Sequence, residues 1–413
     1  MKMDNSNKIF CLLWHTLSLV ILLSPFFVVH GFSPTPTLQL GRSSTQMLTS
    51  KIRQNNFSGD ERKRSNNTGV RASSYPLAAT QEEDSSKIPF PLVVWRFTRP
   101  HTLIGSALAI PAIHMLAAPT VQSIFSANML KSTLYAMVPA LLMNLYITGL
   151  NQITDVEIDK INKPYLPIAN GDLSLNNAKI IVALSLIGSL TLGIAHPLYG
   201  TNGLNFALWG SAILGTMYSL SPFRLKRFPI LAAFCIVAVR GTVVNAGFYA
   251  HALAAAFSST ATSGTTTVLQ CLSNDLKCQL SSLFFGVFGI VIALMKDVPD
   301  IEGDKHANIR TFTVRVGQKA IFHTMRRLVS LLFYSFGLGF AGGSYLAIAQ
   351  NSVESSYIPA FRAGIAFVAF RFGWKARQEG KNVNAEDNKE VFSYYMYLWK
   401  LFYASYLVLP FAK

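Results

Sequence analysis

Long apolar stretches recur from about Val93 to the C-terminus of this chain, and they constrain its fold more than any other feature. Several of them approach the roughly 20 residues that a helix needs to cross a bilayer. Only 14% of the 413 residues are charged, whereas soluble domains carry about a quarter of such residues. The sequence therefore predicts an all-α, polytopic membrane protein.

Nine of these stretches are long enough to be membrane spans. The predicted spans cover residues 102–118, 132–150, 178–197, 204–221, 229–256, 279–296, 328–349, 357–373 and 393–411. Basic residues concentrate in the loops after the second, fourth, sixth and eighth spans: Lys160 and Lys163; Arg224, Lys226 and Arg227; Lys305, Arg310, Arg315, Lys319, Arg326 and Arg327; and Arg371, Lys375, Arg377 and Lys381. The positive-inside rule would place all four loops on one face of the membrane, which supports the count.

The N-terminus precedes this region with two segments of different composition. Residues 1–31 predict a signal peptide, with Lys2 and Lys8 before an apolar run, although a membrane anchor is the alternative. Residues 32–91 are mostly rich in Ser, Thr, Asn and basic residues, and we expect a disordered, transit-like leader. Together they resemble the two-part leader of plastid proteins in algae with secondary plastids, which implies a plastid membrane. A secreted or endomembrane route is the simpler alternative.

The formal net charge of +16 raises the question of nucleic-acid binding. The basic residues lie in short loops between apolar stretches, where they set membrane orientation or bind small anions. No basic helix or nucleic-acid motif accompanies them. We therefore expect the lipid bilayer, and no nucleic acid, as a partner.

Acidic residues are rare after Asp84, but seven of them form two tight groups at the ends of apolar spans. If each group is helical, one face carries Asn151, Asp155 and Asp159, and another carries Asp297, Asp300 and Asp304. Stacked carboxylates repel one another and need a cation. Oxygen ligands suit magnesium, which binds through one or two carboxylates together with substrate phosphates.

A single group of this kind would also fit a solvated helix end, where acids pair with neighbouring lysines. Two such groups on the same predicted face make that alternative much weaker. Their placement in the two parts of the chain indicates an internal duplication around a central cavity, although the flanking sequences show little repeat identity.

Basic residues follow both acidic groups and complete a predicted anion site. They are Lys163, Arg224, Lys226, Arg227, Lys305 and Arg310. Magnesium between carboxylates, with cations around it, forms a clamp for the diphosphate of a substrate and stabilises it as a leaving group. Each of these bases alone also fits an orientation signal.

These residues resemble the two signatures of UbiA-type prenyltransferases. The matching motifs are Asn151-Gln-x-x-Asp155-x-x-x-Asp159 with Asn162-Lys-Pro-Tyr-Leu-Pro167, and Lys296-Asp-x-Pro-Asp300-x-x-Gly-Asp304. The residues of these motifs are similar to those of the homogentisate prenyltransferases of plastids. Two further segments, Arg99-Pro-His-Thr102 and Trp399-Lys-Leu-Phe-Tyr403, also resemble that branch. The resemblance covers residues 92–413 and implies a transmembrane prenyltransferase domain with about nine helices around a central cavity.

The resemblance also implies roles for these residues. Magnesium would be held by Asp155, Asp159, Asp300 and Asp304, with Asp297 as a further ligand, and Asn151 would help to orient the diphosphate. The prenyl diphosphate would ionise, and homogentisate would attack the allylic cation and lose its carboxyl group as carbon dioxide.

Two branches of this family remain open, together with one class outside enzymes. Ser221-Pro-Phe-Arg-Leu-Lys-Arg-Phe-Pro229 resembles solanesyl-transferring members, which serve plastoquinone biosynthesis. Ile309-Arg-Thr-Phe-Thr-Val-Arg-Val-Gly-Gln318 and Tyr397-Leu-Trp-Lys-Leu-Phe-Tyr403 resemble phytyl-transferring members of tocopherol biosynthesis, which we favour. The alternative outside enzymes is a cation-coupled transporter, because acids in membrane proteins mark ion paths. Transporter acids usually lie near the middle of the bilayer, whereas these lie at span ends.

Overall fold

The computed structural model describes residues 88–257, 267–349 and 357–412. The predicted signal peptide at 1–31 and most of the predicted leader lie outside the described residues, so both stay predictions. Within the described ranges every regular element is helical, as the sequence predicts.

The first half of the described region contains two long hairpins of helices and a broken fifth segment. Its elements are α3 (Phe90–Phe97), α4 (Pro100–Ala117), α5 (Val121–Ile124), α6 (Ala127–Thr154), α7 (Val156–Asn162), α8 (Leu175–Ala195), α9 (Asn202–Ser219), η1 (Leu225–Arg227), α10 (Pro229–Val237), η2 (Ala238–Val243) and α11 (Val244–Ala256). The turn η2 is a single π-helical turn between α10 and α11.

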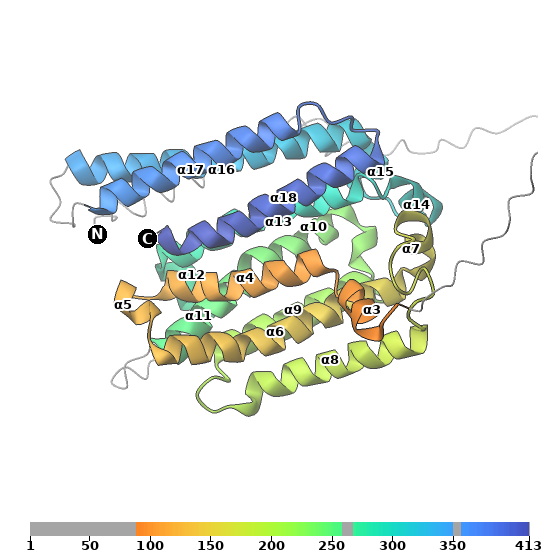
Figure 1. Cartoon of the computed structure of the whole chain (residues 1–413), viewed down its shortest axis with the longest axis horizontal. Coiled ribbons are helices and arrows are strands. Elements are labelled where there is room, and N and C mark those ends of the chain that lie inside the picture. The colour runs from red at the N-terminus through yellow and green to blue at the C-terminus, as the bar shows by residue number, and fades with distance from the viewer. Residues whose placement is uncertain (1–87, 258–266, 350–356, 413) are drawn as a thin grey trace, which may run out of the picture. The chain divides into compact units, whose positions relative to one another are not determined.

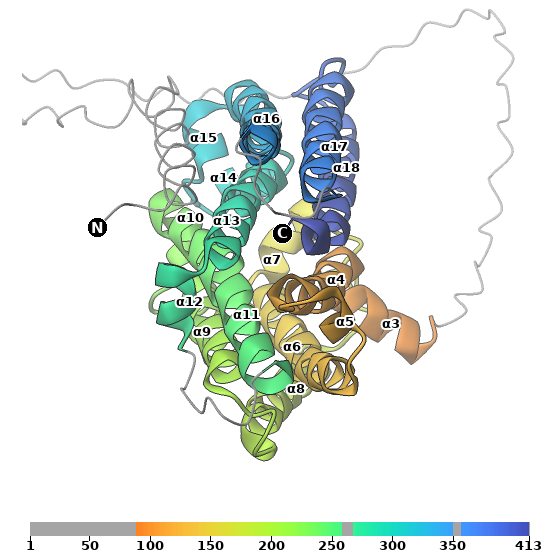
Figure 2. The ribbon, with the colours of Figure 1, turned by 90° about the vertical axis from the view of Figure 1, so that its left-hand side faces the viewer.

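The second half repeats the alternation of long and short helices. Its elements are α12 (Val268–Asn274), α13 (Leu276–Asp297), α14 (Ile301–His306), α15 (Phe312–Val316), α16 (Gln318–Ala349), α17 (Tyr357–Glu379), α18 (Asn388–Val408) and η3 (Leu409–Phe411). The short helices α7 and α14 each follow a long helix, and Figure 1 places both at the same end of the bundle. Figure 2 views the helices nearly end-on, with α11 and α13 on one side and α4 and α18 on the other.

Each predicted span coincides with a long helical segment, and the boundaries differ most at α16 and α17. Helix α16 begins ten residues before the predicted span at 328, and α17 extends to Glu379. The basic residues Lys319, Arg326 and Arg327 therefore lie on a helix, not in the loop that the sequence predicts. Lysine and arginine are good helix formers, so a boundary drawn at the basic residues makes the predicted helix too short.

Six helical segments in the described part of the chain are long and apolar enough to cross a membrane. They are Pro100–Ala117, Ala127–Thr154, Leu175–Ala195, Pro229–Ala256, Leu276–Asp297 and Gln318–Ala349. Helices α9, α17 and α18 have the length but are less apolar, so the count of nine spans stays a prediction.

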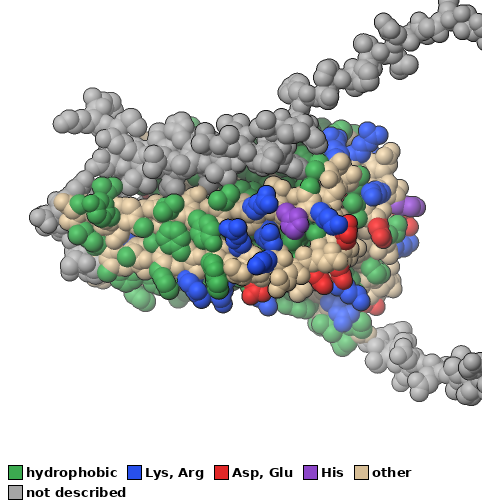
Figure 3. Space-filling view, turned by 90° about the horizontal axis from the view of Figure 1, so that it is seen from above, with side chains coloured by type: hydrophobic (Ala, Val, Ile, Leu, Met, Phe, Trp, Pro, Cys, Tyr) green, Lys and Arg blue, Asp and Glu red, His purple; other side chains and the backbone are tan. Residues whose placement is uncertain are grey.

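Helix α8 shows why these segments suit lipid. Its outer face carries the exposed side chains of Ile180, Leu184 and Ile187, while Ala178 and Val182 are buried against the bundle. A helix that is apolar on both faces belongs in a membrane, where lipid covers the outer face. Figure 3 shows charged side chains toward one end of the molecule, the end at which Figure 1 places α7 and α14.

Glycines allow the closest contacts between helices. A Cβ atom on Gly203 of α9 would lie 2.5 Å from the backbone nitrogen of His251 and 2.6 Å from the carbonyl oxygen of Gly247, both on α11. Backbone-to-backbone packing of this kind is how small residues join helices in membranes.

We expect Gly203→Ala to destabilise the protein, because α9 and α11 must move apart to admit the methyl group. Overpacking of this kind removes on the order of 1–3 kcal/mol. Gly342→Ala is the control, since nothing lies within 4 Å of a Cβ there and alanine favours the helix by up to about 1 kcal/mol. The midpoint of thermal unfolding in detergent should fall only for Gly203→Ala; equal midpoints for the two variants would contradict the close contact.

Candidate active site at the charged end of a buried cavity

A cavity of about 320 Å³ lies between helices of both halves of the described region. Helices α4, α6, α9, α13 and α18 and the turn η2 contribute to its walls, and α7 and α14 border it at one end. Apolar and aromatic side chains form most of the walls. The charged and amide side chains at the border with α7 and α14 are Asn151, Asp155, Asp159, Asn162, Lys163, Lys226, Lys296, Asp297, Asp300 and Asp304.

The acidic groups lie at breaks between helices and not on continuous helices as the sequence predicts. Helix α6 ends at Thr154, and Asp155 has φ −118° and ψ 16° before α7 begins. Helix α13 ends at Asp297, and Asp300 precedes α14. Pro299 accounts for the second break, because it has no amide hydrogen with which to continue the helix after Val298, whose φ of −64° and ψ of −49° are still helical. Each break turns its carboxylates toward the cavity.

Asp155 is held by three side chains. Its carboxylate accepts a hydrogen bond from Asn151 Nδ2 at 3.0 Å, and forms ion pairs with Lys226 Nζ at 2.5 Å and with Arg224 at 3.1 Å. Only 8% of the Lys226 side chain is exposed. Burial lowers the pKa of Lys226, although the negative charge of Asp155 acts in the opposite direction. The pair is therefore a buried one, in which each charge depends on the other.

In the second half of the described region, Asp300 pairs with cations as Asp155 does in the first half. Lys163 Nζ, which follows α7, donates to its carboxylate, and Lys296 Nζ lies 3.6 Å from it and 2.6 Å from Asp297. Burial alone would raise the pKa of Asp300, but the positive charges of Lys163 and Lys296 outweigh it and hold that pKa below its usual value. Asp300 is thus ionised and shared between two ammonium groups.

Asp159 and Asp304 are less well compensated. Arg99 lies 3.7 Å from the Oδ2 atom of Asp159, but this buried oxygen accepts no hydrogen bond in the described part of the chain. Burial raises the pKa of Asp159 against the charge of Arg99. Burial also raises the pKa of Asp304 to about 7, and the nearby charge of Asp297 adds to this shift. A bound cation would compensate the negative charge of both carboxylates.

The described residues contain no set of three His, Cys, Asp or Glu side chains gathered closely enough to bind one ion by themselves. This arrangement differs from a closed structural metal site.

Asn162 joins the two halves directly beside the acids. Its side-chain nitrogen donates to the carbonyl oxygen of Asp300 at 3.0 Å, and its side-chain oxygen accepts from the amide of Gly303 at 2.9 Å. A Cβ atom on Gly303 would lie 2.4 Å from that side-chain oxygen. Glycine at this position therefore lets α14 approach the end of α7, which brings Asp159 and Asp304 to one cavity.

Two of the cations have unusual backbone conformations. Arg99, immediately before α4, has φ 52°, and Arg224, immediately before η1, has φ 38°. Residues with side chains rarely adopt this left-handed conformation, which is unfavourable by about 1–3 kcal/mol and occurs mostly at functional sites. Both arginines contact carboxylates at the charged end.

The structure brings together most, but not all, of the residues that the sequence predicts for the site. Asn151, Asp155, Asp159, Asp297, Asp300, Asp304, Lys163 and Lys226 line the cavity, and Arg224 contacts Asp155. Arg227, Lys305 and Arg310 are exposed and are not among the residues that line the cavity. Their positions near the acids in the sequence do not translate into cavity contacts. Arg227 and Lys305 lie on short helices whose successive residues face different directions, and Arg310 lies in the loop between α14 and α15.

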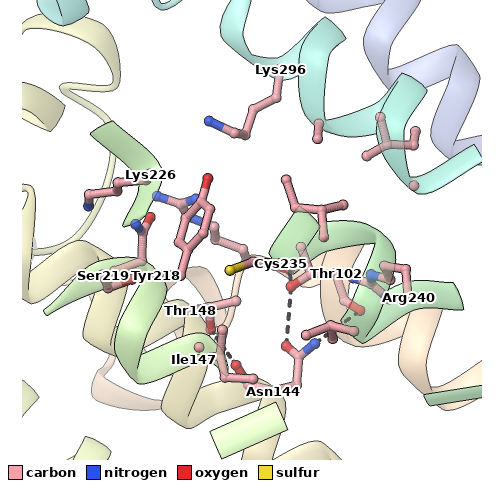
Figure 4. A pocket seen from close by; sticks show the side chains of 18 of the residues that line it. Thr102, Asn144, Ile147, Thr148, Tyr218, Ser219, Lys226, Cys235, Arg240 and Lys296 are labelled. Carbon is pink, nitrogen blue, oxygen red and sulfur yellow. Dashed lines mark hydrogen bonds between the residues drawn. The ribbon is translucent and has the colours of Figure 1, made fainter. Parts of the chain in front are cut away.

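Three further cations line the cavity, although the sequence analysis assigned them no role in the site: Lys296, Arg99 and Arg240. Lys296 lies within the second motif, and Arg99 lies in the motif before the first span. Arg240 is the sole charged residue in the predicted span 229–256, and that isolation was the signal that could have identified it. Figure 4 shows Lys296, Lys226 and Arg240 around the pocket.

These features define a class of protein: a helical membrane protein whose apolar cavity ends in balanced carboxylates and cations. A site of this kind suits a molecule with an anionic head and an apolar body. The profile of the UbiA prenyltransferase family matches residues 100–401. The chain belongs to this family and is a prenyltransferase, which excludes the transporter alternative.

Curated relatives support the same assignment. Homogentisate phytyltransferase 1 of Arabidopsis thaliana, a chloroplastic protein, is 40% identical over 77% of this chain and 75% of its own length. The chloroplastic homogentisate solanesyltransferase of the same plant is 33% identical over 89% of this chain and 88% of its own.

Among solved structures, a UbiA homolog from Archaeoglobus fulgidus, bound to DMAPP and Mg2+, aligns over 77% of this chain and 98% of its own, with 14% identity and a TM-score of 0.49.

We expect Asp155→Asn to destabilise the protein by on the order of 3 kcal/mol, because it removes the full charge that compensates buried Lys226. Adding Lys226→Met should restore much of the loss, since no buried ammonium group then remains there. Glu157→Gln is the control, because Glu157 pairs with Lys160 on the surface and is 82% exposed. Thermal unfolding midpoints of the four proteins measure this; a double variant no more stable than Asp155→Asn would contradict the pairing.

Proposed function

We propose that this protein transfers a prenyl group from a prenyl diphosphate to homogentisate, with magnesium as the cofactor. The observation that carries the proposal is the meeting of two acidic groups, from α6–α7 and α13–α14, with cations at one end of an apolar cavity. The apolar walls suit an isoprenoid chain, and the charged end suits its diphosphate.

The residues present fit a magnesium ion. Asp159 offers a buried oxygen without a hydrogen-bond donor, and Asp304 forms no ion pair within 4 Å in the described part of the chain. We assign magnesium binding to the carboxylates of Asp155, Asp159, Asp297, Asp300 and Asp304, of which one or two would bind an ion directly, together with phosphate oxygens and water. When bound, magnesium supplies positive charge that stabilises the leaving diphosphate.

The cations at the charged end would bind the diphosphate. Lys163, Arg224 and Lys226 now pair with carboxylates, and they would give part of that pairing to phosphate oxygens as the acids take up magnesium. Asn151 donates to Asp155, and we assign it the task of orienting that carboxylate and the diphosphate. The exposed residues Arg227, Lys305 and Arg310 have no cavity contact to support the same role, and for them it stays a prediction.

The prenyl transfer forms one carbon–carbon bond and breaks one carbon–oxygen bond, and the accompanying decarboxylation breaks the carbon–carbon bond to the carboxylate. The bond between the first prenyl carbon and the diphosphate oxygen breaks, and its electrons leave with the diphosphate. A ring carbon of homogentisate bonds to the allylic cation, and the ring loses a proton. The side-arm carboxylate leaves as carbon dioxide, and the side-arm carbon takes up a proton. Apolar walls protect the cation from water.

We favour phytyl as the prenyl group and tocopherol biosynthesis as the pathway. The support is the higher identity to the phytyl-transferring relative than to the solanesyl-transferring one, 40% against 33%. Solanesyl transfer in plastoquinone biosynthesis is the second candidate, supported by coverage of 88% of that relative's length.

We also propose that the protein lies in a plastid membrane. Both named plant relatives are chloroplastic, and six described helical segments are long and apolar enough to cross a bilayer. Residues 1–31 and 32–91 would direct it there as signal and transit segments, ahead of the catalytic domain at 92–413.

Membranes containing the protein, supplied with magnesium and homogentisate, should form a prenylated, decarboxylated quinol from phytyl diphosphate. Mass spectrometry identifies the product, and solanesyl diphosphate is supplied in parallel. A product only from solanesyl diphosphate would reverse the preference for phytyl. No product from either donor, with folded protein, would overturn homogentisate as the acceptor.

Removal of magnesium by a chelator should abolish transfer, and added magnesium should restore it. Asp304→Asn should raise the magnesium concentration for half-maximal rate by about tenfold or more, because one ligand charge is lost. Glu302→Gln is the matched control, since Glu302 lies on the same short helix but is exposed. An unchanged magnesium requirement in Asp304→Asn would remove Asp304 from the ion's ligands.

A further inference from the structure

Arg240 differs from the other cations along the cavity. The others each lie within 4 Å of a carboxylate: Arg99, Lys163, Lys226 and Lys296. Arg240 has no carboxylate within that distance in the part of the chain that the structure describes. Its guanidinium carbon instead lies 5.9 Å from the ring centre of Trp399 and 5.8 Å from that of Phe402.

The backbone explains how Arg240 comes to face the cavity. It lies in the π-helical turn η2, an irregularity that is frequent at functional sites. The turn packs closely on α13: a Cβ on Gly241 would lie 3.0 Å from Gly286 Cα. The stem of the Arg240 side chain passes over Gly289 of α13, where a Cβ would lie 3.1 Å from Arg240 Cβ and 3.4 Å from Arg240 Cγ. Both residues line the cavity, so glycine at 289 leaves room there for the arginine side chain.

A cation in this position needs an anion. Arg240 lies within the segment Pro229–Ala256, which is apolar enough to span a membrane, and a charge there is unfavourable without a partner. The faces of Trp399 and Phe402 offset part of that penalty. These rings do not provide a carboxylate to the guanidinium donors. A planar guanidinium is well suited to bind a carboxylate through two parallel hydrogen bonds.

We propose that Arg240 binds the carboxylate of the aromatic acceptor. The inference rests on the proposed function, in which that acceptor is homogentisate. The ring of His101 lies 5.3 Å from that of Trp399, edge to face, and His101 also lines the cavity. These aromatic groups beside Arg240 give the flat ring of the acceptor a surface to pack on.

This position would keep the two substrate anions apart. Figure 4 shows Arg240 across the pocket from Lys226, which pairs with Asp155 at the charged end. A carboxylate held at Arg240 cannot compete for magnesium or for the cations that bind the diphosphate. The ring then extends from Arg240 toward the carbon that the diphosphate leaves, and acceptors without a carboxylate lose this anchor.

Arg240→Met tests the proposal against Arg240→Lys, which keeps the charge without the planar donor pair. We expect Arg240→Met to raise the KM for homogentisate by about tenfold or more, with a smaller rise in Arg240→Lys. The KM for the prenyl diphosphate should stay unchanged in both, which also shows that the variants are folded. The methyl ester of homogentisate cannot lose carbon dioxide, so it is used as an inhibitor. It should compete with homogentisate only weakly in the wild type, and its inhibition constant should be the same in Arg240→Met.

A measurement on the unaltered protein covers the case in which the variants do not fold. Phenylglyoxal modifies arginine, and mass spectrometry reports modification of the peptide that contains Arg240. Homogentisate should protect this peptide, and its methyl ester should not. Equal modification with and without homogentisate would overturn the proposal.

The outcomes separate this inference from the function on which it rests. Prenylation of homogentisate by the wild type, with an unchanged KM for homogentisate in Arg240→Met, overturns the role of Arg240 alone. Failure of the wild type to prenylate homogentisate overturns both. A selective rise in that KM together with protection of the Arg240 peptide supports both.

Discussion

Ion pairs between carboxylates and cations, most of them with a buried carboxylate, are the interaction on which the rest of this structure depends. A charge in an apolar bundle needs a partner, because its desolvation is not otherwise offset. Asp155 meets this need through Lys226, and Asp300 does so through Lys163. The partner of each acid comes from a different element, so the pairs also fix η1 beside the end of α6 and α7 beside α14.

The sequence alone predicts those features of the fold and the site that depend on composition. Membrane helices follow from long apolar stretches, and the acidic groups are conspicuous because few other acids occur nearby. The break at Asp155 was missed, since local spacing there favours a continuous helix and the break accompanies pairing with Lys226 and Arg224, about 70 residues away. Arg240 was missed although it is the one charged residue of its predicted span. What the sequence does not show is its contact with Trp399 and Phe402, which are distant in the chain.

The prediction of diphosphate-binding bases illustrates a second limit. Lys226 and Arg227 are adjacent and equally basic, yet Lys226 is buried beside Asp155 and Arg227 is exposed. Composition assigns both to the same role, whereas the 3-10 turn directs only one side chain inward. The exposed bases Lys305 and Arg310 fit the positive-inside rule equally well. Orientation in the membrane and substrate binding thus draw on the same residue types, and only the fold separates them.

The charged end contains as many carboxylates as cations. Its carboxylates belong to Asp155, Asp159, Asp297, Asp300 and Asp304, and its cations to Arg99, Lys163, Arg224, Lys226 and Lys296. Burial raises the pKa of Asp159 and of Asp304, so a cation bound beside them would relieve repulsion among the acids. A diphosphate alone would add negative charge beside these carboxylates, which is unfavourable at low dielectric. In the proposed function the diphosphate would therefore depend on magnesium for its binding and its departure.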